Sequence, residues 1–314
     1  MTSPASPPGK VVIGTRGSAL ARWQADHVGS ELARLYPGLV LEQKIIVTDG
    51  DRFQTGPVID LGGKGVWVKE IEAALLDGSV DLAVHSLKDV PATLAPGLVL
   101  AAIPLRADPR DVLVSREGDP LRALPAGSRV GTSSLRRVCQ VRALRPDLSV
   151  ELLRGNVDTR LRKVAEGVVD AAILAAAGLD RLGFGARITE RLSIDDMLPS
   201  IGQGALAIET RAGDQRVREL CRALADRAAE ITVAAERSLL EALGAGCRTP
   251  VGGHATVEGD VVVLRGLVGR PDATEILKDE ERGPVSAAAE VGRALAARLL
   301  ARGAARILAE LGDR

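Results

Sequence analysis

The turn at residues 131–137 combines hydroxyl side chains with arginines where a helix is expected to begin. Backbone N–H groups at a helix N-terminus lack helical partners and attract anions. Helix capping alone would explain one serine or threonine, but not two arginines beside it. The pattern therefore predicts an anion site, with donors from Thr132, Ser133, Ser134, Arg136 and Arg137.

Two further strand-to-helix turns carry the same residue types. Residues 154–160 read Arg-Gly-Asn-Val-Asp-Thr-Arg, so Arg154 ends a strand and Arg160 falls in the first turns of the next helix. Parallel strands bring their carboxyl ends to one sheet edge, where open α/β sheets bind ligands. Residues 15–18, Thr-Arg-Gly-Ser, form a shorter turn of this kind in another part of the chain. The repeated placement predicts a ligand held between two lobes.

A carboxylate joins these cations directly after a short apolar strand. Residues 84–91 read Val-His-Ser-Leu-Lys-Asp-Val-Pro, and the proline stops any helix there. A Lys–Asp pair alone would be an ordinary surface pair of little energetic worth. Beside three arginine-bearing or hydroxyl-bearing turns, a functional role is favoured for Ser86, Lys88 and Asp89.

The three cysteines have spacings that fit neither a disulfide framework nor a metal site. Cys139 and Cys221 lie in expected helices beside apolar residues, which predicts buried structural thiols. Cys247 follows Gly-Ala-Gly on a loop that can approach another domain closely. A single cysteine is more often inert than reactive, so the residues alone do not make Cys247 functional.

Strands that alternate with helices predict two α/β units. The first has strands at 11–14, 39–47 and 82–84 and helices at 19–35 and 66–76. The pattern restarts after residue 111, with strands at 129–131, 150–153 and 171–174 and helices at 135–144 and 157–166. Such alternation implies a parallel sheet in each unit. From residue 227, a long helix, the Cys247 loop, strands around turns at 258–260 and 269–274, and two final helices predict a small α+β domain.

Composition excludes several classes of function. A chain of 314 residues is long enough for two or three domains. Aromatic residues make up 2%, too few to build stacking platforms for nucleic-acid bases, and the formal net charge is zero. The longest smooth apolar run, 171–177, is far below the roughly 20 residues of a membrane span. We expect a soluble cytoplasmic protein that binds neither nucleic acid nor membrane.

Taken together, these segments resemble the signature segments of the porphobilinogen deaminase (hydroxymethylbilane synthase) family in order and spacing. They are AVHSLKDVP at 83–91, GTSSLRR at 131–137, LRGNVDTR at 153–160, AAGLDRL at 176–182, LPSIGQG at 198–204 and GAGC ending at Cys247. The likeness extends from about Lys10 to Leu311. It implies a transferase of tetrapyrrole and heme biosynthesis that couples four porphobilinogen molecules head to tail, releases ammonia each time and hydrolyses off hydroxymethylbilane.

The resemblance also implies a covalent dipyrromethane cofactor, held by Cys247 through a thioether, and no metal. Asp89 matches the catalytic carboxylate of the family, which accepts pyrrole N–H bonds and stabilises positive charge. The residues matched to cofactor binding are Ser86, Lys88, Thr132, Ser133, Ser134, Arg136 and Arg137. Those matched to the substrate or the growing chain are Arg16, Ser18, Lys64, Arg154, Asn156, Arg160, Arg181 and Gln203.

The fold implied by the family is α/β: two lobes like those of periplasmic binding proteins, plus a small α+β C-terminal domain that bears the cofactor. The expected domains are 9–105 with 204–222, then 106–203, then 227–314. The return of the chain to the first lobe comes from the resemblance and not from periodicity. The family expectation is a monomer.

Two other functions stay open on the residues alone. Two α/β lobes with an arginine-lined cleft also describe an anion-binding receptor or sensor domain, which would carry no covalent adduct. A cysteine hydrolase would pair Cys247 with His85 or His254, although no spacing supports such a dyad.

Overall fold

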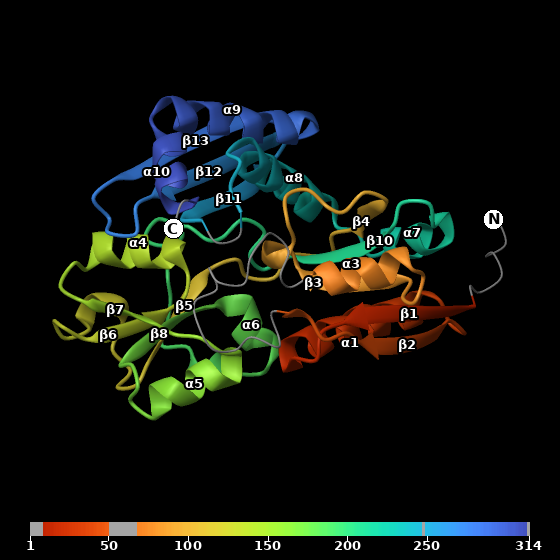
Figure 1. The fold of residues 1–314 in the computed structure, drawn as a ribbon, viewed down its shortest axis with the longest axis horizontal. Coiled ribbons are helices and arrows are strands. Elements are labelled where there is room, and N and C mark those ends of the chain that lie inside the picture. Colours follow the sequence, from red (N-terminus) through yellow and green to blue (C-terminus); the bar gives the residue numbers. More distant parts are fainter. Residues whose placement is uncertain (1–8, 50–67, 247–248, 313–314) are drawn as a thin grey trace. The chain divides into compact units, whose positions relative to one another are not determined.

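The computed structural model describes residues 9–49, 68–246 and 249–312 (Figure 1). The chain divides into two compact units. Unit 1 comprises Met1–Arg106 and Ala205–Glu230, and unit 2 comprises Ala107–Gly204 and Ile231–Arg314. Within the described ranges, no helix is both long and apolar enough to cross a membrane.

Unit 1 is built on a five-stranded sheet of order β2-β1-β3-β10-β4. Strand β1 is parallel to β2 and β3, whereas β10 is antiparallel to both β3 and β4. The predicted parallel sheet is therefore wrong in part, because β10 follows residue 204 and enters the sheet in the opposite direction. The strands are β1 Lys10–Thr15, β2 Val40–Ile45, β3 Leu82–Ser86, β4 Leu98–Ala102 and β10 Leu206–Arg211.

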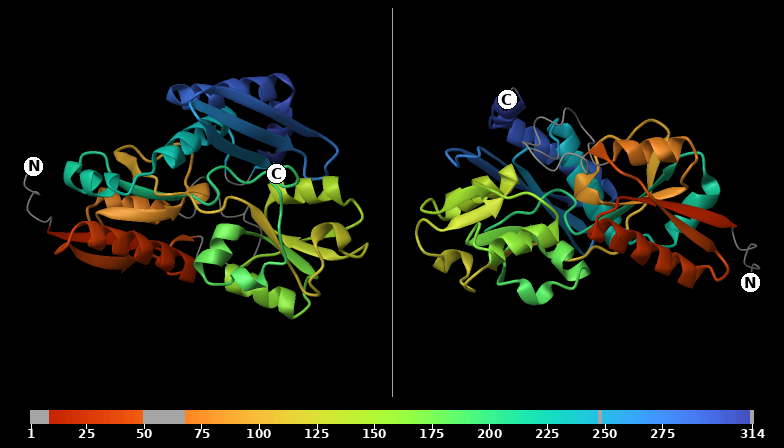
Figure 2. Two further views of the ribbon diagram at one scale, coloured as in Figure 1. Left: turned by 180° about the vertical axis from the view of Figure 1, so that it is seen from behind. Right: turned by 60° about the horizontal axis from the view of Figure 1, so that its bottom comes forward.

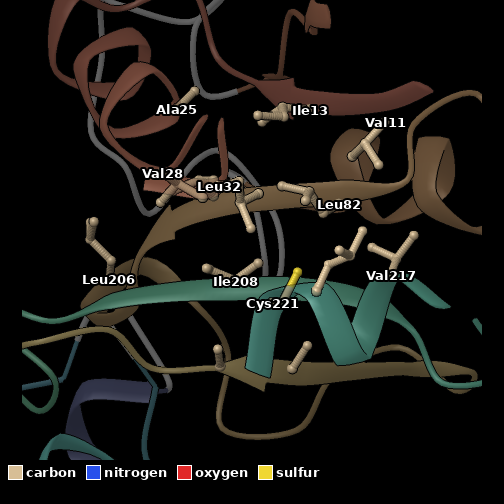
Figure 3. Packing of buried hydrophobic residues seen from close by; sticks show 14 of the residues in the cluster. Val11, Ile13, Ala25, Val28, Leu32, Leu82, Leu206, Ile208, Val217 and Cys221 are labelled. Atoms are coloured by element: carbon tan, nitrogen blue, oxygen red, sulfur yellow. The ribbon is translucent and has the colours of Figure 1, made fainter. Parts of the chain in front are cut away.

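Helices cover both faces of this sheet. Helices α1 (Ala19–Leu35) and α7 (Gln215–Arg222) bury Val28, Leu32 and Cys221 against Ile13 and Ile208 on one face (Figure 3). Helix α3 (Lys69–Leu76) packs on the other face, beside Val80 and Ala83. Successive strand residues alternate between faces, and residues three to four apart share a helix face, so this periodicity fixes which side chains enter each core.

Unit 2 contains a second five-stranded sheet, of order β7-β6-β8-β5-β9. Strand β6 is parallel to β7 and β8, and β5 is antiparallel to β8 and β9, so this sheet is also mixed. Its strands are β5 Asp111–Ser115, β6 Arg129–Thr132, β7 Ser149–Leu152, β8 Ala171–Ala175 and β9 Glu190–Arg191. Its helices are α4 Leu135–Leu144, α5 Val157–Ala165 and α6 Ala176–Arg181.

The C-terminal part of unit 2 is a three-stranded antiparallel sheet with helices, which agrees with the predicted α+β domain. Helix α9 buries Val291, Leu295 and Leu299, and Figures 1 and 2 show it, in dark blue, along one face of the sheet. The strands are β11 Val251–Glu258, β12 Val261–Gly269 and β13 Ile276–Pro284. The helices are α8 Arg227–Ala242, α9 Ala288–Ala301 and α10 Ala304–Gly312. The predicted fold class, two α/β sheets plus this small part, is confirmed.

Candidate functional site

The arginine pair of the 131–137 turn forms a buried ion-pair cluster with Asp111, called the Asp111 cluster below. Arg137 donates from Nε and Nη2 to Oδ1 of Asp111, at 3.1 and 2.7 Å, and from Nη1 to the carbonyl of Ile173 at 2.8 Å. Arg136 donates from Nη1 to Oδ2 of Asp111 at 2.7 Å and to the carbonyl of Leu198 at 2.6 Å. Arg136 and Arg137 are 2% and 5% exposed, and Asp111 is fully buried.

The charges in this cluster do not balance, because one carboxylate faces two guanidinium groups. Burial alone would raise the pKa of Asp111, but Arg136 and Arg137 together hold it well below its usual range. Burial lowers the pKa of Arg136, and the attraction of Asp111 opposes that shift. Arg136 Nε is buried and donates to no described residue. An unsatisfied buried donor costs about 1–3 kcal/mol, which an anionic ligand would offset.

Gln203 joins the same cluster from the segment that follows α6 and β9. Its Nε2 donates to Oδ1 of Asp111 at 2.8 Å and to the carbonyl of Pro109 at 2.7 Å. Gln140 fixes the same segment, since its Oε1 accepts from the backbone N–H of Leu198 at 2.7 Å. Sequence reasoning missed Asp111. The one feature that could have revealed it is its position at the start of an apolar run, Asp-Val-Leu-Val. An aspartate buried in such a run requires a charged or hydrogen-bonding partner.

The hydroxyl residues lie at the carboxyl end of β6, next to the 154–160 turn. Strands β6 and β7 run parallel with Thr132 opposite Leu152, so the two turns share one sheet edge as predicted. Arg160 donates from Nη2 to Oγ of Ser133 at 3.4 Å and from Nε to the carbonyl of Gly155 at 2.8 Å. Thr132 is buried, Ser133 and Asn156 are exposed, and Ser134 and Arg154 are half-buried.

Glycine is required within that turn. Gly155 has φ +111°, and a Cβ there would lie 2.6 Å from Cγ2 of Thr159. The chain thereby leaves β7 and enters α5 sharply enough to bring Arg160 back over the strand end.

Unit 1 brings a second set of predicted residues to one edge of its sheet. Strands β1 and β3 are parallel neighbours, so the turn that holds Arg16 and Ser18 and the residues after Ser86 leave the sheet together. Ser18 caps α1 by accepting from the N–H of Ala21 at 3.3 Å. Ser86 Oγ accepts from Nε2 of Gln24, on α1, at 2.7 Å.

Asp89 and Lys88 belong to a single 3₁₀ turn, η2 (Leu87–Asp89), directly after β3. Both are half-buried, whereas Leu87 and Val90 on either side are buried and anchor the turn. Behind the turn, His85 is buried with Nε2 3.0 Å from Oε2 of Glu209. The carboxylate predicted to be catalytic thus belongs to a half-buried residue, on a short turn fixed at both ends.

Arg181 lies at the end of α6 and donates from Nη2 to the carbonyl of Gly204 at 2.8 Å. Burial lowers the pKa of its guanidinium to about 10, so the group stays charged at neutral pH. Gly204 has φ +87°, and a Cβ there would overlap the carbonyl oxygen of Ala107. Arg181 therefore contacts the residue that directly follows Gln203.

The structure describes two of the three cysteines, Cys139 and Cys221. Cys139 and Cys221 are buried in α4 and α7, which confirms the prediction of buried thiols. Burial raises their pKa values to about 11 and about 12, so both are protonated at neutral pH. Cys247 and Lys64 lie outside the described residues. His254 is buried, with Nδ1 3.6 Å from Oε1 of Glu236.

Comparison with solved structures finds similarities to domains described as binding a cofactor or a solute. The chain matches the cofactor-binding domain of the Cbl transcriptional regulator with a TM-score of 0.42 and 20% identity, over 71% of this chain and 91% of that one. It matches a TRAP periplasmic solute binding protein from Pseudomonas putida F1 with a TM-score of 0.39 and 11% identity, over 74% of this chain and 81% of that one.

Comparison of sequences is far more specific. Residues 11–219 match the family model described as porphobilinogen deaminase, dipyromethane cofactor binding domain, and residues 230–301 match the porphobilinogen deaminase C-terminal domain. The porphobilinogen deaminase of Syntrophotalea carbinolica is 52% identical over 95% of both chains. That of Syntrophobacter fumaroxidans is 50% identical over 95% of this chain and 97% of its own length. The chain belongs to the porphobilinogen deaminase family.

Proposed function

We propose that this chain condenses four porphobilinogen molecules head to tail, releases one ammonia for each, and hydrolyses the product off as hydroxymethylbilane. The observation that carries the proposal is the match of both family domains, together with relatives about half identical over 95% of the chain. The reaction belongs to tetrapyrrole biosynthesis.

The cofactor assigned to the chain is dipyrromethane, attached through the thiol of Cys247. When bound, it supplies the pyrrole on which chain growth starts. The described residues fit such a group, because its acetate and propionate arms need cations and the Asp111 cluster carries one positive charge in excess. Arg136 also offers a buried Nε without a described partner. The residues assigned to its carboxylates are Ser86, Lys88, Thr132, Ser133, Ser134, Arg136 and Arg137.

Asp89 is assigned as the catalytic carboxylate. Loss of ammonia from porphobilinogen leaves a positively charged ring system. A ring carbon of the neighbouring pyrrole attacks the methylene carbon that carried the amine, and after the C–C bond forms that ring carbon must lose its proton. A preorganised carboxylate stabilises the cation and accepts a hydrogen bond from the pyrrole N–H. This stabilisation is strongest where water is excluded. Asp89 suits this task because it is half-buried on an anchored turn.

The remaining cations are assigned to the incoming substrate and the growing chain. Each added pyrrole brings two carboxylates, and arginine can bind a carboxylate through two parallel N–H donors. The pairing of Ser133 with Arg160 supports a continuous run of donors from the cofactor residues to the substrate residues. The residues assigned to the substrate and chain are Arg16, Ser18, Lys64, Arg154, Asn156, Arg160, Arg181 and Gln203.

We also propose three domains, 9–105 with 204–222, 106–203 and 227–314, in a monomer that acts in the cytoplasm. The family resemblance supports these assignments. Light scattering of the purified protein, with the mass of a single chain as the expected result, tests the oligomeric state.

The proposed function is tested by the ratio of ammonia released to porphobilinogen consumed and to tetrapyrrole formed. Purified protein is supplied with porphobilinogen, and ammonia and linear tetrapyrrole are both measured, with Cys247→Ser as the matched control. We expect one ammonia for each porphobilinogen consumed, and a tetrapyrrole yield one quarter of the ammonia. A receptor that only binds anions would release no more ammonia than the control, and that result would overturn the proposal.

A further inference from the structure

We infer that Asp111 is a positioning residue: its carboxylate holds Arg136 so that the Nε–Nη2 edge of that guanidinium can bind a carboxylate of the pyrrole chain. The inference rests on the proposed function and adds to it a residue that contacts neither substrate nor cofactor.

The two guanidinium groups differ in how many of their nitrogens are hydrogen-bonded within the protein. Arg137 uses one N–H of each of Nε, Nη1 and Nη2 in hydrogen bonds to Asp111 and Ile173, so only the second N–H groups of Nη1 and Nη2 remain for a ligand. Arg136 is held through Nη1 alone, by Asp111 and the carbonyl of Leu198. Among the described residues, no hydrogen bond involves its Nε or Nη2. That edge is the one with which arginine binds a carboxylate through two parallel bonds.

The carboxylate of Asp111 is itself held rigidly. Asp111 is the first residue of β5, opposite Ala175 of β8, and its carbonyl accepts from the N–H of Leu192 at 2.9 Å. Its Oδ1 also accepts from Gln203 at 2.8 Å. A carboxylate fixed on an internal strand by three side chains leaves Arg136 Nη1 little freedom, so the Nε–Nη2 edge, which has no hydrogen bond to the described residues, is preorganised before any ligand arrives.

A second ion pair on the same sheet, which is partly exposed, leaves none of its guanidinium nitrogens without a partner. Asp170 faces one arginine, Arg129, whose Nε and Nη2 both donate to it at 3.2 and 2.9 Å. Arg129 Nη1 donates to the carbonyl of Val168, so its three nitrogens all have partners in the protein. The Asp111 cluster instead leaves a buried donor and an unbalanced positive charge, which a pair serving stability alone would not need.

The experiment compares Asp111→Glu and Asp111→Asn with Asp170→Asn as the matched control for losing an arginine partner. Glu keeps the charge but displaces it by one methylene, whereas Asn removes it. Apoprotein of each variant is treated with increasing porphobilinogen. Intact mass gives the fraction of folded protein that carries the cofactor adduct, and thermal unfolding is followed in parallel. Steady-state kcat and KM are measured on the loaded fraction.

The expected result is a tenfold or greater rise in the porphobilinogen concentration needed for half-maximal loading of Asp111→Glu. Asp170→Asn should load within about twofold of the wild type, because a displaced ligand group typically costs far more than a lost remote ion pair. If Asp111→Glu loads and turns over as the wild type does, Asp111 only stabilises the fold and the inference is overturned. If the wild type itself never acquires the adduct, the proposed function fails first, and the two failures are thereby distinguished.

Discussion

At the scale of single residues, two aspartates of the candidate site have opposite surroundings. Asp111 is fully buried and accepts from Arg136, Arg137 and Gln203, so its oxygens are committed within the protein. Asp89 is half-buried at the end of one 3₁₀ turn. Only a carboxylate of the second kind can respond to charge that develops on a substrate.

Replacement of Asp89 tests that distinction. Asp89→Asn keeps the shape of the side chain but cannot stabilise a cation, and loss of one preorganised electrostatic group typically costs on the order of 10²–10³ in rate. Asp89→Glu should retain more activity, because it keeps the charge. Ammonia release in a single turnover is measured on cofactor-loaded protein, with Asp26→Asn, on the exposed face of α1, as the control. Turnover of loaded Asp89→Asn within a few-fold of the wild type would show that Asp89 is not catalytic.

The thiols give a second prediction at this scale. Because burial raises the pKa of Cys139 to about 11 and that of Cys221 to about 12, neither forms appreciable thiolate at pH 8. In a Cys247→Ser background, native protein treated with iodoacetamide should gain no mass, whereas the same protein in denaturant should gain two adducts. Stoichiometric alkylation of the native protein would contradict the buried positions of these residues.

At the scale of elements, two helices were predicted with their observed bounds, whereas helices α6 and α7 and strands β4, β5, β9 and β10 were not predicted. Helices α1 and α4 begin and end at the predicted residues, because a polar cap, an apolar stripe and a proline or a polar stop lie in sequence order. Strands β5 and β10 were not predicted, although their segments are apolar. Both are antiparallel partners brought in from distant parts of the chain, and local periodicity carries no information about such pairing.

The segment between β9 and β10 depends on Gly204, and replacement of this glycine should destabilise the fold. Its φ of +87° is costly for any residue with a Cβ, and that Cβ would also overlap the backbone of Ala107, which cannot rotate away as a side chain could. Gly183→Ala is the control: φ is +75° there, but nothing lies within 4 Å of the added Cβ.

Both substitutions should cost the left-handed penalty of about 1–2 kcal/mol, and Gly204→Ala should cost about 1–3 kcal/mol more for overpacking. Urea unfolding gives both values. Equal losses of stability in the two variants would mean that the backbone contact at Gly204 is readily relieved.

At the scale of the whole molecule, the pH dependence of stability should report the Asp111 cluster. The pKa of Asp111 is lowered in the folded protein, so its contribution is fully present above its unfolded pKa of about 3.9 and is lost as the pH falls towards the folded value. The destabilisation caused by Asp111→Asn should therefore be large at pH 7 and smaller at pH 3. Urea midpoints at the two pH values test this. A difference between wild type and variant that does not change with pH would contradict the ion-pair account.

The candidate site was predictable only where its residues lie in recognisable turns. The arginines and hydroxyls of 131–137 and 154–160 follow strands that the sequence revealed, and the parallel pairing of β6 and β7 brings them together. Asp111 was missed because its role depends on the antiparallel placement of β5. The assignment of Cys247 came from family resemblance, since a lone thiol on a glycine-rich loop has no distinguishing pattern.

Intact mass shows whether this chain builds a tetrapyrrole on a cofactor bound to Cys247. Wild type, Cys247→Ser and Cys139→Ser are purified from cells that make porphobilinogen. We expect a stable mass increment of one dipyrromethane on the wild type and on Cys139→Ser, and the bare polypeptide mass for Cys247→Ser. A wild type with the bare mass, or a Cys247→Ser protein that keeps the increment, would contradict this expectation.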